Sequence, residues 1–136
     1  MDIMKTYIVD TIALVKYLQD DLPLPADKVF KSSEQGKSKL LVPEMVIGEF
    51  IYISLKGRLK VSDPRSMIME FLISMSASGY MDFVEMDLDS WEEYLHSQIP
   101  ELHDRLICAI AKSRDAAVIT NDIDINERGG VEVVWD

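Results

Sequence analysis

The sequence predicts an α/β fold in which helices cover both faces of a mostly parallel central sheet of four to five strands. Short apolar runs rich in β-forming residues alternate along the 136-residue chain with stretches whose apolar residues recur at helical spacing. Such alternation is typical of βαβ units, which build parallel sheets. Because no internal repeat or long linker divides the chain, one domain over residues 1–136 is expected.

The first strand and the two helices after it follow from a change of pattern at Asp10. Tyr7–Val9 is a short run of β-forming residues, whereas Thr11–Leu18 carries its apolar residues three to four positions apart. We therefore expect a buried strand followed by a helix. A run of aspartate and proline breaks that helix, and residues 26–35 predict a second one that a glycine ends.

The middle of the chain predicts a second strand and two further helices. Leu40–Val42 is the strand, and Pro43 suits the first position of a helix that runs to about Leu55 before a glycine closes it. Residues 62–64, Ser-Asp-Pro, are a helix-start signal, and apolar residues at helical spacing follow until the next glycine.

The last third of the chain continues the alternation of strands and helices. The elements expected here are a strand at 83–86, helices at 88–97 and 102–113, and strands at 117–120 and 131–135.

Composition and charge narrow the classes of function. The net charge of −10 repels a polyanion and argues against nucleic-acid binding by simple electrostatics. No apolar run approaches the roughly 18 residues that span a bilayer, and no signal-peptide pattern opens the chain, so a cytoplasmic protein with no membrane partner is expected. The one cysteine, Cys108, lies among apolar residues and predicts a buried thiol rather than a zinc or disulfide site.

Two aspartates follow predicted strands at the edge where open parallel sheets bind ligands. Asp10 comes directly after the first strand, and Asp122 follows the strand that ends at Thr120. Each also has a structural explanation, because Asp10 suits a helix N-cap and Asp122 suits a turn in the Asn-Asp-Ile-Asp loop. Their shared position at strand ends favours a common site without excluding those alternatives.

Two further acids lie on predicted helices. The helical neighbours of Glu49 are apolar or aromatic, and an unpaired charge among them would cost several kcal/mol. No Lys or Arg lies within one turn, so Glu49 needs either a distant partner or a metal ion. Asp104 falls in the first turn of its helix, where the helix dipole alone could explain it, although its side of the helix continues with apolar residues.

Together, Asp10, Glu49, Asp104 and Asp122 predict one acidic site for a divalent metal ion. Carboxylates this close repel one another strongly unless a cation lies among them. Mg²⁺ or Mn²⁺ suits a set of oxygen ligands, and such ions activate water and polarise phosphoryl oxygens. A bound cation also reverses the local field that a polyanionic substrate meets, so the net charge no longer excludes a nuclease.

Four blocks of the sequence resemble, in order and spacing, the motif blocks of PIN domains: 8–11, 46–50, 103–111 and 119–122. The resemblance implies a compact three-layer α/β/α fold and Mg²⁺- or Mn²⁺-dependent endoribonuclease activity that cleaves RNA with metal-activated water. The acids of the family correspond to Asp10, Glu49, Asp104 and Asp122. Single-domain members of this size are similar to VapC-type toxins of type II toxin–antitoxin pairs, which implies a homodimer and a small antitoxin that covers the site.

Several residues near the four acids have roles that the sequence leaves open. Thr11 and Thr120 match a hydroxyl that often lies beside the first and last acids of the family. Asp124 is either an additional metal contributor or, more simply, a turn residue. His103, beside Asp104, either acts on a proton or, more simply, is a surface histidine at a helix start. Ile125 stands where the family often has an aromatic residue.

An RNA path would need positive charge, and the sequence offers a cluster at 56–60 together with Arg65 and Arg105. A solvated helix end explains the cluster at least as well. The rival function is a PIN-like binding or scaffold module that acts through its acidic groove. A phosphatase with an aspartate nucleophile ranks last, because Asp10-Thr11-Ile12 lacks the Asp-x-Asp-x-Thr pattern.

Overall fold

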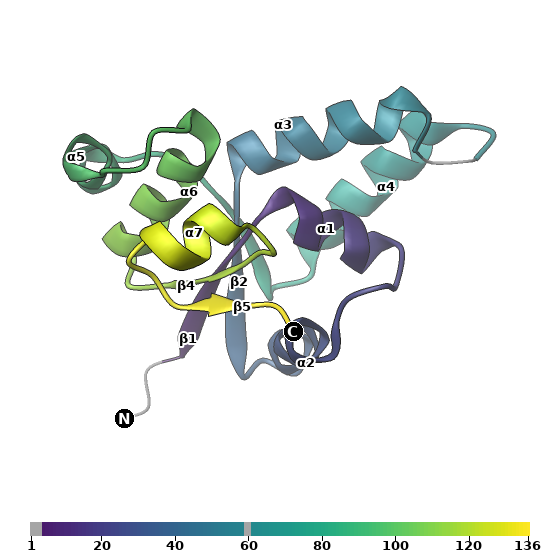
Figure 1. Ribbon diagram of the computed structural model, residues 1–136. Helices are drawn as coiled ribbons and strands as arrows, with labels where there is room; N and C mark the ends of the chain where they lie inside the picture. Colours follow the sequence, from purple (N-terminus) through teal and green to yellow (C-terminus); the bar gives the residue numbers. More distant parts are fainter. Residues whose placement is uncertain (1–3, 59–60) are drawn as a thin grey trace.

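The computed structural model describes residues 4–58 and 61–136, apart from the side chains of residues 57 and 58, and its centre is an all-parallel sheet. The sheet has five strands in the order β3-β2-β1-β4-β5 (Figure 1). The strands are β1 (Lys5–Val9), β2 (Ser38–Pro43), β3 (Met81–Val84), β4 (Ala117–Ile119) and β5 (Val133–Val134). The predicted fold class is therefore confirmed, with β3 lying two residues earlier than expected.

Helices cover both faces of this sheet. They are α1 (Thr11–Leu18), α2 (Leu24–Glu34), α3 (Glu44–Ile53), α4 (Pro64–Ala77), α5 (Leu88–His96), α6 (Leu102–Ser113) and α7 (Ile123–Arg128). Figure 1 shows α5 and α6 on the left of the sheet and α1, α2 and α4 on the right. This arrangement follows from right-handed crossovers, since the chain moves one way from β1 to β3 and the other way from β3 to β5. No described helix is both long enough and apolar enough to span a membrane.

Three of the differences from the sequence prediction concern helices α3 and α7. Pro43 has extended dihedral angles, so it ends β2 and caps α3 instead of beginning the helix. Beyond Ile53 the chain continues as a short π-helical segment, Ser54–Arg58, and α3 therefore ends before Leu55. The six-residue α7 was predicted as a turn, because a helix this short shows too little apolar periodicity.

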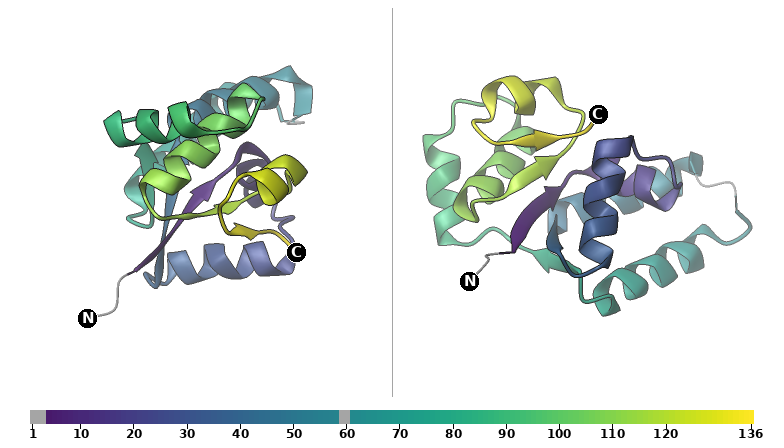
Figure 2. Two further views of the ribbon diagram at one scale, coloured as in Figure 1. Left: turned by 60° about the vertical axis from the view of Figure 1, so that its left-hand side comes forward. Right: turned by 90° about the horizontal axis from the view of Figure 1, so that it is seen from below.

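The hydrophobic core lies between the sheet and the helices on both of its faces. Phe30, Phe50, Leu40, Ile107 and Ile119 are among its fully buried side chains. The C-terminal segment packs beside α2 (Figure 2), where the amide of Ala26 donates to the carbonyl of Trp135 at 3.3 Å. This hydrogen bond joins the segment that follows β5 to the helical layer.

The sheet has a topological switch point between β1 and β4. Successive connections leave these neighbouring strands toward opposite edges, so a crevice opens beyond their carboxyl ends. The register pairs Val9 with Ile119, which brings the next residues, Asp10 and Thr120, side by side. The amide of Asp10 donates to the carbonyl of Ile119 at 3.1 Å and extends this pairing into the crevice.

Candidate functional site

A cleft of about 590 Å³ opens at the switch point, between α1, α3, the start of α6 and the loop after β4. Its lining is Asp10, Thr11, Ile12, Val15, Lys16, Gln19, Glu49, Ile53, His103, Asp104, Asn121 and Asp122. All four acids that the sequence singled out therefore face one cavity, although they come from positions more than 100 residues apart.

Asp10 is buried at the base of the cleft and accepts three hydrogen bonds. Its Oδ1 accepts from the amide of Thr11 at 2.8 Å and from Nε2 of His103 at 3.0 Å, and its Oδ2 accepts from the hydroxyl of Thr120 at 2.7 Å. Burial alone would raise the pKa of Asp10, but the bonds from His103, Thr120 and Thr11 outweigh it and lower this pKa. Asp10 is therefore a fixed carboxylate that also caps α1.

His103 lies between two of the acids and is not the surface histidine that the sequence predicted. Its Nε2 bonds to Asp10, and its Nδ1 lies 3.5 Å from Oε2 of Glu49. The bond to Asp10 raises the pKa of His103 to about 9 against the opposing effect of burial, and the charges of Glu49 and Glu101 add to the rise. The imidazolium is thus the internal cation for this half of the cleft.

Glu49 faces the cleft from α3 with 42% of its side chain exposed. The sequence indicated that it needs a partner, and the partner is the histidine contributed by α6. This pairing could not be predicted from the sequence, because Glu49 and His103 are 54 positions apart. They meet only because α3 and α6 converge at the end of the sheet.

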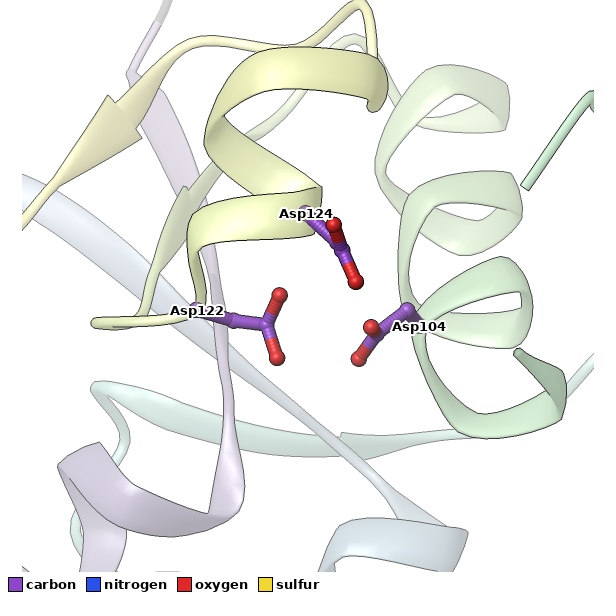
Figure 3. Close-up of side chains that lie close together, drawn as sticks. All are labelled: Asp104, Asp122 and Asp124. Atoms are coloured by element: carbon purple, nitrogen blue, oxygen red, sulfur yellow. The ribbon is translucent and has the colours of Figure 1, made fainter. Parts of the chain in front are cut away.

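A cluster of three aspartates lies at the other end of the cleft, where Asp104 and Asp122 line the cavity and Asp124 lies beside them. Asp104 comes from the first turn of α6, Asp122 from the start of α7, and Asp124 from the first turn of α7. One carboxylate oxygen of each lies within 4.8 Å of the other two, and Figure 3 shows the three side chains pointing toward one another. Asp10 and Glu49 lie in the same cleft but outside this cluster.

Asp104 holds its carboxylate in surroundings that disfavour a negative charge. It is buried, and burial together with the charges of Asp122, Glu101 and Asp10 raises its pKa to about 6, although His103 opposes this. No described residue donates a hydrogen bond to its carboxylate. Placing like charges in a poorly solvated site is unfavourable, and a cation among the three aspartates would relieve it.

Glu101 is a positioning residue that no sequence motif indicated. Its carboxylate caps α6 by accepting from the amides of His103 and Asp104 at 3.0 and 2.7 Å. These bonds hold the first turn of α6 against the sheet edge, and they lower the pKa of Glu101 itself. Glutamate is an uncommon N-cap residue, so the usual Ser/Thr/Asp/Asn signal was missing.

Asp122 and Asp124 owe their positions to α7. Asp122 is the N-cap of this helix, since its Oδ1 accepts from the amide of Ile125 at 3.0 Å. Its own amide donates to the hydroxyl of Thr120 at 3.1 Å, which joins it to the Asp10 network. The turn predicted for Asp124 is in fact the first helical turn, and that turn aims its carboxylate at Asp104.

The remaining sequence predictions concern the basic residues and the cysteine, and their outcomes differ. Arg105 does not line the cleft; its Nε donates to the carbonyl of Tyr94 at 2.9 Å and its guanidinium lies over that ring. In the predicted cluster at 56–60, only the side chain of Lys56 is described, and residues 59 and 60 lie outside the described residues. Cys108 is buried as predicted, and burial raises the pKa of its thiol to about 12.

The donor set fits a hard divalent cation. Every ligand that the aspartate cluster offers is a carboxylate oxygen, which Mg²⁺ and Mn²⁺ prefer, and no sulfur or imidazole nitrogen belongs to it. Burial, and then the charge of Asp122, raise the pKa of Asp104, so a positive charge beside this carboxylate would stabilise its ionised form. Asp104, Asp122 and Asp124 would therefore hold the ion.

Fold and cleft together define an α/β protein with an acidic site at the switch point of a parallel sheet. Residues 7–131 match the family model of the PIN domain. The chain therefore belongs to the PIN domain family, as the four sequence blocks predicted. A comparison with curated protein sequences finds no match.

Solved structures share this fold at low sequence identity. VapBC2 from Rickettsia felis, bound to a promoter DNA fragment, aligns with a TM-score of 0.73 at 16% identity over 96% of this chain and 99% of that chain. DNA-bound VapBC from Salmonella typhimurium gives 0.70 at 15% over 96% and 97%. FitAcB from Neisseria gonorrhoeae gives 0.69 at 17% over 93% and 95%. At these sequence identities the structural similarity shows that the fold is shared.

Proposed function

We propose that this protein is a Mg²⁺- or Mn²⁺-dependent endoribonuclease and the toxin of a type II toxin–antitoxin pair of the VapC type. PIN domains are generally nucleases. The observation that carries the proposal is the convergence of Asp104, Asp122 and Asp124 within 4.8 Å, at the end of the cleft that Asp10 and Glu49 also line. RNA as the substrate follows from the family resemblance.

The acidic side chains of the site have different proposed roles. Asp104, Asp122 and Asp124 would hold a divalent ion, which would supply activation of water and stabilisation of negative charge on the phosphate. Asp10, held as a carboxylate by three hydrogen bonds, contributes a fixed negative charge to the cleft. Glu49 is half exposed and free enough to orient a water molecule or to complete the ligand set.

The partners proposed for this chain are an RNA substrate, a second copy of itself and a small antitoxin. The solved structures of the same fold include VapBC complexes from Rickettsia felis and Salmonella typhimurium, both bound to DNA. These relatives support an antitoxin that would cover the acidic cleft. The homodimer rests on the resemblance to VapC-type toxins.

One observation favours the rival function, a PIN-like binding or scaffold module. His103 already bridges Asp10 and Glu49, so one of the two negative charges in this half of the cleft is balanced without a metal ion. A module that works through its groove would need no more than this. Calorimetric titration with Mn²⁺ separates the two functions, since only the nuclease requires the aspartate cluster to bind the ion.

An RNA cleavage assay tests the proposed activity. Wild-type protein should cleave single-stranded RNA with Mn²⁺ and lose the activity in EDTA, and Asp104→Asn should be inactive because the cluster loses a charged ligand. Asp89→Asn is the matched control, because Asp89 also lies in the first turn of a helix but is exposed on α5, away from the cleft. Cleavage by Asp104→Asn at the wild-type rate would contradict the assignment.

A further inference from the structure

The cleft extends beyond its acidic end into an arm that the metal site does not use. This arm, named here the α1–α3 arm, is lined by Ile12, Val15, Lys16, Gln19 and Ile53. It follows α1 from its first residue to its C-cap, a length of about 12 Å at the helical rise of 1.5 Å per residue. An acidic centre for chemistry therefore continues directly into a second surface of different character.

The surface of the arm combines apolar walls with one amide. Ile12 and Val15 form one wall and Ile53 the other, and all three side chains are half-buried. Gln19, at the exposed end of α1, offers both a donor and an acceptor from one side chain. Apolar walls with a few placed polar groups are typical of sites for small organic groups, and a nucleobase has the matching chemistry of a flat apolar face and a polar edge.

Lys16 supplies positive charge in the same arm, and α3 carries an exposed aromatic ring one turn from Glu49. Lys16 lines it, and its pairing with Asp21 at 3.1 Å is solvent-exposed and weak enough to exchange for a phosphate. On α3, Tyr52 is 59% exposed one turn from Glu49, and Nζ of Lys56 lies 4.5 Å from the centre of its ring. A chain of net charge −10 needs such local cations to hold RNA, and an exposed ring offers a surface for base stacking.

The hydroxyl of Thr11 marks the junction between the acids and the arm. Thr11 is only 4% exposed and lines the cleft, yet its Oγ1 has no hydrogen-bond partner among the described residues. Buried hydroxyls are rarely left unmatched in folded proteins. A ligand oxygen at this point, such as that of a phosphate between the metal site and the arm, would satisfy it.

We propose that the α1–α3 arm binds a nucleoside of single-stranded RNA next to the scissile phosphate. Val15 and Ile53 contact the base, and Gln19 reads its edge and so determines which base is accepted. This inference rests on the proposed ribonuclease function and deepens it by naming specificity-determining residues. An apolar peptide side chain in the same place would offer no partner to the Gln19 amide or the Thr11 hydroxyl, whereas a nucleotide has a partner for each.

The test compares base preference in two readouts on the full chain. Cleavage of a mixed-sequence RNA with Mn²⁺ gives the preference at the cut site, and fluorescence anisotropy with labelled A, C, G and U hexanucleotides in Ca²⁺ gives the preference in binding. Gln19→Leu should reduce the ratio between best and worst base by about tenfold, because the edge contact is lost. Gln35→Leu, at the exposed C-cap of α2, is the matched control and should leave the ratio unchanged.

The outcomes separate this proposal from the ribonuclease assignment. An unchanged preference in Gln19→Leu, with wild-type cleavage intact, overturns the arm and leaves the ribonuclease. A wild-type chain that cuts no RNA but binds hexanucleotides with a preference that Gln19→Leu removes overturns the ribonuclease and supports the arm. If Gln19→Leu loses binding to a co-expressed antitoxin but keeps the wild-type RNA preference, the arm binds a protein and the proposal is overturned. The absence of any RNA binding by the wild-type chain also overturns the proposal.

Discussion

Replacing Asp104 by asparagine should stabilise the metal-free protein while removing its metal-dependent activity. Asp104 is buried, and burial followed by the charges of Asp122 and Glu101 raises its pKa from 3.8 to about 6. No described residue donates a hydrogen bond to its carboxylate, so the asparagine loses no partner. It loses only a charge that the folded protein holds at a disadvantage.

The sign and size of the effect follow from the raised pKa of Asp104. The folded state binds this proton more tightly than the unfolded chain, so stability falls as the pH rises from about 4 to about 6, and the full penalty remains above that window. A pKa difference of one corresponds to about 1.4 kcal/mol, so the penalty at neutral pH is on the order of 1–3 kcal/mol after allowing for solvent in the cleft. Asp104→Asn should recover it, which raises the melting temperature by about 4 °C per kcal/mol.

Urea unfolding in EDTA at pH 7 and at pH 4.5 measures this penalty. Asp104→Asn should be more stable than wild type at pH 7, and the difference should shrink at pH 4.5. Asp89→Asn, exposed on α5, should show no such gain. Added Mn²⁺ should reverse the order by stabilising wild type alone. An Asp104→Asn variant that is less stable at pH 7, or whose advantage does not depend on pH, refutes the electrostatic reasoning.

Two further predictions concern the histidine bridge and the contact between α6 and α7. The bond to Asp10 raises the pKa of His103 to about 9, so in EDTA its contribution to stability is complete below about pH 6.5 and is lost as the pH rises through about 9. Urea unfolding should show that loss in wild type and not in His103→Gln; equal profiles would contradict the bridge. Gly129→Ala should destabilise by about 1–3 kcal/mol, because its Cβ would clash with the backbone oxygen of Ile125 and lie 2.8 Å from Sγ of Cys108. Gly48→Ala, in open space on α3, should stabilise by about 1 kcal/mol, and the opposite order in thermal unfolding would contradict this packing.

The fold was predictable from the sequence because its strands are buried and parallel. Tyr7–Val9 and Ala117–Ile119 read as short apolar runs, and the structure places both at the centre of the sheet. The edges were less predictable. β3 is exposed along part of its length and was placed two residues late, and β5 is only two residues long. Weak burial leaves little pattern for a sequence to display.

The sequence alternatives for the acids turned out not to exclude one another. Asp10 does cap α1, and Asp122 does cap α7, yet both face the cleft, since a carboxylate has two oxygens and a cap needs only one. A structural role for each therefore predicted nothing about its chemistry. Their position after β1 and β4 was the informative signal, because those strands flank the switch point.

What the sequence could not predict depends on contacts between distant elements. The pairing of His103 with Asp10 and Glu49 joins three elements, and neither residue spacing nor periodicity encodes it. Asp124 was assigned to a turn because α7 is too short for its period to show. The division of the cleft into a histidine-bridged half and an aspartate cluster therefore emerges only in three dimensions.

Crystals soaked in Mn²⁺ test the central claim most directly, through the anomalous scattering of the ion. We expect an anomalous peak within ligand distance of Asp104, Asp122 and Asp124, with oxygen ligands at about 2.1–2.2 Å. The peak should vanish in Asp104→Asn and persist in Asp89→Asn. A wild-type crystal that shows no peak in the cleft, or a peak only elsewhere on the surface, would contradict a metal-dependent site in this PIN domain.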